Sequence, residues 1–552
     1  MVGLNPESGE AKPAPILDDP FLWLEEIEGA RALAWVHDRN RECFDELESD
    51  ARYATFLEQA EALLNAKDRI PYGSVRGRHV YNFWRDAGHV RGILRRTPLA
   101  SYRLAKPEWE TVLDIDALAN SEDENWVYKG TTWLAPGYGR CLVKLSRGGT
   151  DASVYREFDA EAKRFVDGGF MLPEAKSGVA WLDRDTLLVG TDWGDGSLTA
   201  SGYPRVAKRW KRSTALAKAG TVFEGRKEDI GIWPRVLDSG EATLPMVDQS
   251  LTFFTGAYHL IGDDDQLQRL PLPESVDVAG FYAGRILFTL REAWEIAGRT
   301  YSQGALLGID AAAFRATGEL PRIETVYTPD ERTSIEGVAV SRSGLYVTLL
   351  QNVKGRLLRF SVDANSGKWS AEPLPLPPNG TVSLSAANPH SETVLVNYED
   401  HITPDRLSEY DAGANALTLL KSLPARFRAD DLQVSQHMAG SADGELVPYF
   451  VIHRKGLKPD GSTPTILYGY GGFEISLKPS YSATIGKLWL ERGGAYAVAN
   501  IRGGGEFGPR WHKAALKTNR QRAYDDFIAV AEDLVRRGIT SPKRLGISGG
   551  SN

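Results

Sequence analysis

The sequence predicts three parts: a helical N-terminal segment, a long β-rich region of repeated units typical of a β-propeller, and a parallel α/β sheet at the C-terminus. Apolar residues recur at helical spacing up to about residue 70. Short alternating apolar runs separated by Gly, Asp, Asn and Pro then continue for about 350 residues. Beyond them, strand-like runs alternate with an amphipathic helix, which indicates parallel strands.

The composition is that of a soluble globular protein with more than one core. The chain has 552 residues, of which 42% are hydrophobic and 25% charged. A net charge of −8 without a dense Lys/Arg run argues against nucleic acid as a partner. No apolar run approaches the roughly 18 residues of a membrane span. Residues 1–19 lack the pattern of a signal peptide, so we expect no membrane attachment.

Cysteine is rare in this sequence. Cys43 and Cys141 stand nearly a hundred residues apart, without a second pair that would indicate a metal site or a disulfide framework. This usage is typical of a reducing compartment, so we expect a cytoplasmic protein.

Two amphipathic helices are expected at the start of the chain. Leu33, Val36, Phe44 and Leu47 fall near helical spacing, and the run from Tyr53 to Leu64 repeats it. Pro71 and Gly73 end the pattern, which places the helical segment at 1–71.

The β-rich region, 72–428, contains a loosely recurring theme of a strand-like run, a polar turn and a second run. Residues 79–84 leading to 92–95 and residues 344–349 leading to 356–360 are two examples. Similar starts occur near Leu142, Leu187, Leu251, Ile286 and Val394. About seven such units favour a β-propeller, with a large β-sandwich or two stacked β domains as the alternative. The proline-rich run 373–378 is interpreted as a connection between units rather than a polyproline ligand.

The C-terminal part, 429–552, predicts a parallel sheet. Residues 465–468 and 495–500 have the pattern of buried strands, and 524–537 that of an amphipathic helix carrying Phe527, Ile528, Ala531, Leu534 and Val535. Gly538 is a suitable end for this helix, and 545–548 is expected to form another strand.

The final residues contain a candidate nucleophile. In a G-x-S-x-G nucleophile elbow, the serine occupies a sharp turn directly after a strand. Ser548 matches that pattern literally, between Gly546 and Gly550, but it would still lie inside the strand. Ser551 follows the turn at Gly549 and Gly550, so strand geometry favours Ser551.

Two glycine-rich runs precede this serine. The run 467–473 follows a predicted strand, where a tyrosine hydroxyl and a backbone N–H can stabilise an oxyanion during acyl transfer. The alternative is that Tyr468 and Tyr470 pack on the sheet and the glycines form a tight turn. The run 500–508 lacks the Lys-Ser/Thr ending of a P-loop, so it is interpreted as a turn near the active site in which Arg502 and Glu506 pair.

These runs together resemble the prolyl oligopeptidase family. Six segments agree in order, and the N-terminal run 19–25 with Trp35, Val36 and Asn40 agrees as well. The matching segments are 468–473, 499–508, 511–513, 525–527, 540–544 and 549–552.

The resemblance implies an α/β-hydrolase catalytic domain with an inserted seven-bladed β-propeller, and a helical segment 1–71 that packs on the catalytic domain. It also implies a serine endopeptidase that cleaves short peptides on the carboxyl side of proline through an acyl-enzyme. The propeller would act as a size filter. No metal or organic cofactor is implied, and we expect a monomer whose partners are short peptide substrates.

Matched residue by residue, Ser551 corresponds to the nucleophile and Tyr470 to the oxyanion-hole hydroxyl. Asn552 corresponds to the residue whose backbone N–H completes the hole, and Phe473 to an aromatic contact near the substrate proline. Asn552 and the run 471–473 favour the prolyl type over oligopeptidase B, which cleaves after basic residues.

The family's triad order of Ser, Asp and His raises a further expectation, because no residue follows Asn552. None of the nine histidines matches the general base, and His512 is interpreted as structural. We therefore expect a truncated chain that is inactive alone and poorly soluble, with its last parallel strand at an open edge. A non-catalytic peptide-binding propeller, or an esterase or aminopeptidase on the same fold, remain the alternatives.

Overall fold

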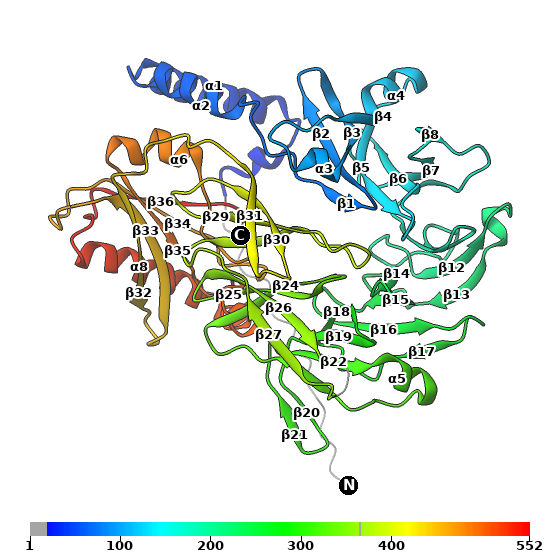
Figure 1. Ribbon diagram of the computed structural model, residues 1–552. Coiled ribbons are helices and arrows are strands. Elements are labelled where there is room, and N and C mark those ends of the chain that lie inside the picture. Colours follow the sequence, from blue (N-terminus) through cyan, green and yellow to red (C-terminus); the bar gives the residue numbers. More distant parts are fainter. Residues whose placement is uncertain (1–18, 364–365, 552) are drawn as a thin grey trace, which may run out of the picture. The chain divides into compact units, whose positions relative to one another are not determined.

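The computed structural model describes residues 19–363 and 366–551 (Figure 1). The chain divides into two compact units between Ala66 and Lys67. Residues 1–18, on which the prediction about a signal peptide depends, lie outside the described residues. Within the described part, no helix is long and apolar enough to cross a membrane.

The N-terminal unit is helical, and it confirms the two predicted helices. Its elements are η1 (Leu22–Glu25), α1 (Ala30–Ser49) and α2 (Tyr53–Leu64). Trp23 of η1 meets Trp35 of α1 edge to face, with ring centroids 6.4 Å apart. The Arg31 guanidinium lies 4.0 Å from the Trp23 ring centre, so aromatic contacts hold η1 against α1. Packing of this segment on the catalytic part stays a prediction.

The second unit contains seven antiparallel sheets of four or five strands, which confirms the propeller over the β-sandwich. Each is built from strands that are consecutive in the chain, except that a two-stranded hairpin interrupts one of them. Blades 1 to 3 are formed by β1 (Ser74–Arg76), β2 (His79–Asp86), β3 (His89–Pro98) and β4 (Glu110–Asp114); β5 (Trp126–Trp133), β6 (Arg140–Arg147), β7 (Ser153–Asp159), β8 (Arg164–Phe165) and β9 (Met171–Ala175); and β10 (Gly178–Asp183), β11 (Thr186–Gly190), β12 (Val206–Lys211) and β13 (Gly220–Glu224).

Blades 4 and 5 continue this order in the green part of the ribbon (Figure 1). They are formed by β14 (Gly231–Asp238), β15 (Thr243–Ser250), β16 (Gly256–Ile261) and β17 (Leu267–Arg269); and by β18 (Val276–Tyr282), β19 (Arg285–Leu290), β22 (Leu306–Asp310) and β23 (Glu324–Tyr327), with a separate hairpin of β20 (Trp294–Ile296) and β21 (Arg299–Tyr301).

Blades 6 and 7 complete the set. They are formed by β24 (Thr333–Ser341), β25 (Gly344–Gln351), β26 (Lys354–Val362) and β27 (Trp369–Pro373); and by β28 (Thr381–Ala386), β29 (Val394–Glu399), β30 (Arg406–Asp411) and β31 (Ala416–Ser422). Short helices link strands at α3 (Leu99–Tyr102), α4 (Ile115–Glu122), η2 (Leu216–Lys218) and α5 (Ala311–Thr317). The proline-rich run 373–378 does connect two blades, as predicted.

Six of the seven predicted unit starts fall in the second strand of a blade, and one prediction is wrong. Leu251 lies just after β15, in the loop that leads to β16. Its run of apolar residues resembles a strand, whereas β15 itself contains Pro245 and the polar Asp248. Pairing with β14 on one side and β16 on the other makes that less apolar segment a strand.

Blades 1 and 7 share a buried apolar cluster that contains Val75, Val80, Leu395 and Leu407. Because each blade is made of consecutive strands, the first and last blades are joined by side chains and not by a shared strand. Polar contacts add to the cluster, since the Tyr72 hydroxyl donates to Asn397 and Asp405 of blade 7.

The C-terminal sheet has the order β32-β33-β35-β34-β36 and appears in orange to red (Figure 1). Its strands are β32 (Leu432–Gly440), β33 (Leu446–Arg454), β34 (Thr465–Gly469), β35 (Ala495–Ala499) and β36 (Leu545–Gly549); its helices are α6 (Ala483–Leu488), η3 (Leu490–Arg492), α7 (Pro509–Lys513), η4 (Lys517–Asn519) and α8 (Gln521–Arg536). β34 is parallel to both β35 and β36, which confirms the predicted parallel strands. The domain boundaries at 71 and 428 stay predictions.

Helix α8 confirms the predicted amphipathic helix, with one residue of the predicted face wrong. Leu534 is fully buried and Phe527 packs against the core, whereas Ile528 is 51% exposed. Small and acidic side chains at Ala523, Asp526 and Asp533 also lie on the buried face. The two aspartates can be buried because Asp526 pairs with Arg502 and Asp533 accepts a hydrogen bond from the Tyr449 hydroxyl. A hydrophobic pattern in the sequence does not reveal such partners.

Candidate active site

Ser551 lies two residues beyond the end of β36 and has a left-handed backbone, with φ of +54°. A non-glycine residue at positive φ is uncommon, and the nucleophile elbow is a turn that holds a serine under such strain. Ser548 lies inside β36, opposite Tyr468 of β34. Ser551 is exposed, whereas Asn552 lies outside the described residues.

The tyrosine loop begins at the neighbouring strand end. Gly469 of β34 pairs with Gly549 of β36, so Tyr470 and the Ser551 turn leave the same edge of the sheet. The loop then bends sharply, since Phe473 and Glu474 both have positive φ, at +51° and +59°. Phe473 is 56% exposed. Phe473 and Tyr470 line two separate pockets.

The tyrosine loop, 469–474, and the glycine-rich segment 501–508 pack backbone to backbone. A Cβ on Gly503 would lie 2.2 Å from the carbonyl oxygen of Gly471, so only glycine fits there. The Glu474 N–H donates to the Gly503 carbonyl oxygen at 3.2 Å. Arg520 donates a hydrogen bond to the Gly471 carbonyl oxygen. The loop that carries Tyr470 is therefore held by the 501–508 segment and by Arg520.

The predicted pair of Arg502 and Glu506 is wrong. The Arg502 guanidinium is bound by two aspartates instead, at 2.6 Å from Asp526 and 2.6 Å from Asp443. Burial alone would lower the pKa of Arg502, but the hydrogen bonds from its guanidinium to Asp526 and Asp443 outweigh this and raise it. Asp526 lies on α8 and Asp443 in the β32–β33 turn, so neither partner is local in the sequence.

Glu506 is buried, and among the described residues no cation pairs with it. Its Oε1 accepts hydrogen bonds from the Leu477 N–H at 2.9 Å and from the Asn500 side chain at 3.2 Å. Its Oε2 has no hydrogen bond within the described part of the chain. Burial raises the pKa of Glu506 to about 7, because the charged form is poorly solvated there.

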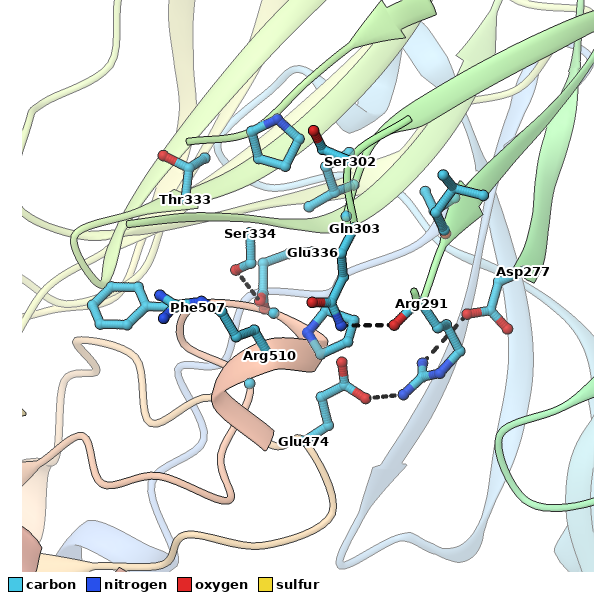
Figure 2. A pocket seen from close by; sticks show the side chains of 18 of the residues that line it. Asp277, Arg291, Ser302, Gln303, Thr333, Ser334, Glu336, Glu474, Phe507 and Arg510 are labelled. Atoms are coloured by element: carbon cyan, nitrogen blue, oxygen red, sulfur yellow. Dashed lines mark hydrogen bonds and ion pairs between the residues drawn. The ribbon is translucent and has the colours of Figure 1, made fainter. Parts of the chain in front are cut away.

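A cavity of about 580 Å³ lies between blades 5 and 6 and these loops, next to Phe473 (Figure 2). Arg291 reaches two carboxylates across it, forming an ion pair with Glu474 and lying 3.4 Å from Asp277. On the opposite wall, Glu336 accepts from Ser334 at 3.3 Å. The cavity wall is thus polar and charged on the propeller side.

An aromatic side chain from the propeller meets Phe473. Phe253, in the loop after β15, is 73% exposed, and its ring centroid lies 6.3 Å from that of Phe473. Phe254 next to it packs on His512, with centroids 5.2 Å apart, and under the Arg291 guanidinium. Sequence reasoning missed these residues, although two adjacent phenylalanines at the end of a polar strand were a visible signal.

His512 is buried, as a structural residue would be. Its Nδ1 lies 2.7 Å from the Gly503 carbonyl oxygen. Across residues 19–363 and 366–551, no histidine forms a hydrogen bond with Ser551.

The propeller, the parallel sheet and the serine turn together define an α/β-hydrolase that carries a β-propeller. Sequence profiles of the prolyl oligopeptidase family match residues 479–552, and the profile of its N-terminal β-propeller domain matches residues 8–239. An uncharacterized peptidase of Sinorhizobium fredii is 42% identical over 99% of this chain and 76% of its own length. The chain therefore belongs to the prolyl oligopeptidase family of serine peptidases.

Other relatives and solved structures agree. A prolyl endopeptidase of Elizabethkingia miricola is 27% identical over 97% of this chain and 73% of its own length. The structure of a post-proline cleaving enzyme from Rickettsia typhi is 30% identical, with a TM-score of 0.86 over 96% of this chain and 78% of its own. Oligopeptidase B from Leishmania major, at 18% identity and a TM-score of 0.74 over 96% of this chain and 74% of its own, shares the fold.

Proposed function

We propose that this protein hydrolyses short peptides on the carboxyl side of proline, with Ser551 as the nucleophile of an acyl-enzyme mechanism. The observation that carries the proposal is the left-handed backbone of Ser551, two residues beyond β36, at the end of the sheet from which the Tyr470 loop also leaves. Ser548, the other candidate, is engaged within the strand. The names of the Elizabethkingia and Rickettsia typhi relatives support cleavage at proline.

The roles of the other residues follow from the chemistry of acyl transfer. Attack of the Ser551 hydroxyl on the substrate carbonyl develops negative charge on its oxygen. The Tyr470 hydroxyl and the backbone N–H of Asn552 would stabilise that oxyanion, each contributing about 3 kcal/mol in comparable sites. Phe473 would contact the substrate proline, and the exposed face of its ring is available for such stacking.

We further propose that the 552 residues alone turn over slowly. Ser551 has no hydrogen bond to a histidine in the described residues, so its hydroxyl keeps its proton and is a weak nucleophile. Loss of the base in a comparable enzyme lowers kcat by about 10⁶-fold. A cytoplasmic location and a monomeric state also stay predictions; Cys43 and Cys141 are both free.

The test compares two serine variants in the protein purified from its natural host. Hydrolysis of a blocked Gly-Pro amide should be abolished by Ser551→Ala and retained by the matched control Ser548→Ala, which changes the other candidate serine. The recombinant 552-residue chain and its Ser551→Ala variant should hydrolyse the same amide at similarly low rates. Loss of activity in Ser548→Ala alone would overturn the assignment of the nucleophile.

Substrate choice is tested separately. A blocked Gly-Pro amide should be cleaved in preference to the matched Gly-Arg amide, a simple ester and a free-amine dipeptide. Preference for the arginine substrate would indicate oligopeptidase B-like specificity, and preference for the ester an esterase. Binding of peptides without hydrolysis in the host protein would indicate a non-catalytic propeller.

A further inference from the structure

Phe473 and Glu474 form a strained turn at the end of the tyrosine loop. Both residues have positive φ, at +51° and +59°, a conformation that non-glycine residues keep only where the surrounding structure holds it. The Glu474 N–H donates to the Gly503 carbonyl oxygen at 3.2 Å. A Cβ on Gly505 would lie 2.2 Å from the Glu474 carbonyl oxygen, so the two backbones are in direct contact. These contacts fix the main chain of Glu474 but not its side chain.

The side chain of Glu474 is held from the propeller. Arg291, the residue after β19 of blade 5, forms an ion pair with it. The Arg291 side chain is 13% exposed and that of Glu474 17%, so solvent and salt screen this pair only weakly. Asp277, the second carboxylate near Arg291, lies 3.4 Å away and is 58% exposed. Glu474 is therefore the main partner of the Arg291 guanidinium.

Arg291 is itself anchored at its backbone. Its N–H donates to the Ser275 carbonyl oxygen at 2.9 Å. Its carbonyl oxygen accepts from the Gln303 side-chain amide at 2.7 Å and from the Lys513 ammonium group at 3.2 Å. The guanidinium therefore extends towards Glu474 from a fixed point of blade 5 (Figure 2).

The same guanidinium contacts an aromatic side chain in the loop after β15. Its central carbon lies 4.4 Å from the ring centre of Phe254, within the range of a cation–π contact. Phe253, the residue before Phe254, has its ring 6.3 Å from that of Phe473. Arg291 thus binds the sequence neighbours of both phenylalanines that face each other. A single side chain fixes the place of Phe473 relative to Phe253.

We propose that Arg291 is a positioning residue that holds the ring of Phe473 in place for a substrate proline. This inference rests on the proposed function, in which Phe473 contacts that proline. Without the guanidinium, nothing on the propeller side holds the Glu474 side chain, so the strained turn relaxes and the ring leaves its place. A side chain that is already ordered loses less conformational freedom when a ligand binds. Arg291 therefore determines the preference for proline and not the attack by Ser551.

The preference is tested by kinetics, with each variant made in the protein as its natural host produces it. Arg291→Met keeps an apolar stem against Phe254 and removes the charge. The ratio of kcat/KM for a blocked Gly-Pro amide to kcat/KM for the matched Gly-Ala amide should fall by about fivefold or more. The Gly-Ala value itself should stay within about threefold, whereas damage to the fold would lower both values equally. Arg291→Lys keeps a cation beside Glu474 and should retain the ratio within about twofold.

The neighbouring residue supplies the matched control. Glu292 forms an ion pair with Lys513 of α7 at 2.7 Å. Glu292→Gln therefore also removes a charged contact between blade 5 and the C-terminal part, but not one at the Phe473 turn, and it should leave the ratio unchanged. Glu474→Gln should act like Arg291→Met, and the double variant should be no worse than either alone, because all three lose the same contact.

Hydrogen exchange of the 552-residue chain tests the hold on the turn without any activity. Amide exchange in the peptide that spans 473–478 should be about tenfold faster or more in Arg291→Met, and unchanged in Glu292→Gln. The inference is overturned if Arg291→Met leaves this exchange unchanged, if Glu292→Gln accelerates it equally, or if the Gly-Pro preference survives Arg291→Met. A host protein without that preference would refute the proposed function, and hydrogen exchange would still decide whether Arg291 holds the turn.

Discussion

Arg502 and Asp526 form a buried ion pair in which the aspartate accepts hydrogen bonds from three N–H groups of Arg502. The Arg502 backbone N–H donates to Oδ2 at 2.9 Å, Nε to the same oxygen at 2.9 Å and Nη2 to Oδ1 at 2.6 Å. Both side chains are almost fully buried. The pair fixes the glycine-rich segment 501–508 to α8 and thereby supports the loop that carries Tyr470.

Asp526→Asn should destabilise the protein strongly, because it leaves the buried Arg502 charge partly uncompensated. Breaking a buried pair typically costs about 3–5 kcal/mol, which should lower the midpoint of urea unfolding. The matched control Glu274→Gln removes an acid from the exposed pair with Arg269 and should change stability by less than about 1 kcal/mol. Equal shifts for the two variants would contradict the structural role of Asp526.

Gly503→Ala should impair the active site without a change in charge. The new Cβ would meet the Gly471 carbonyl oxygen at 2.2 Å, and φ of +96° is unfavourable for alanine. Displacement of the tyrosine loop by about 1 Å should lower kcat on the order of 100-fold. Gly220→Ala is the control, since its Cβ would meet open space. A kcat within twofold of the unaltered enzyme would show that the loop does not depend on this contact.

Glu506→Gln should stabilise the protein at alkaline pH. The folded-state pKa of Glu506 is about 7, above its ordinary value of 4.5. Between these values the folded state binds more protons than the unfolded state, so this group makes stability fall as pH rises from 4.5 to 7. The variant removes that loss, with a gain of up to about 3 kcal/mol at pH 8 and little at pH 4.5.

Urea unfolding of the Glu506→Gln variant at the two pH values measures this difference. Glu392→Gln, which changes an exposed acid, should show no pH-dependent gain. A gain of the same size at pH 4.5 and pH 8 would mean that repacking, and not ionisation of Glu506, is responsible.

Phe253→Ala should weaken substrate binding if the propeller contributes to the peptide site. Loss of the ring facing Phe473 leaves the proposed substrate-proline contact less fixed, so KM for the blocked Gly-Pro amide should rise about 2- to 10-fold, the range expected for an aromatic contact of about 0.5–1.5 kcal/mol. The kcat should stay within twofold. Leu419→Ala, which truncates an exposed side chain on β31, serves as the control. An unchanged KM would place Phe253 outside the substrate path.

Local patterns in the sequence predicted most of the elements. Helices α1, α2 and α8 and strands β34 to β36 follow from periodicities of 3.6 and 2 residues, which need only neighbouring residues to be recognised. The turn at Ser551 is likewise local, because glycines at the end of β36 and just after it have no Cβ and let the chain turn sharply there. The same rules failed at Leu251 and Ile528, where the pairing strands and the buried aspartates decided the outcome.

Side-chain partners far apart in the chain were decided only by the tertiary structure. The sequence suggested Glu506 for Arg502 because it is four residues away, but the partners are Asp526 and Asp443, 24 and 59 residues away. Phe253 and Phe473 meet for the same reason. The sequence by itself determined the order of elements, the propeller repeat and the serine turn, since these depend on local conformation and hydrophobic alternation. The tertiary structure decided which charged side chains pair in the interior and which side chains surround the site, because both depend on how the blades and the sheet pack. Desolvation and close contact act between residues that are near in space, whether or not they are near in the chain.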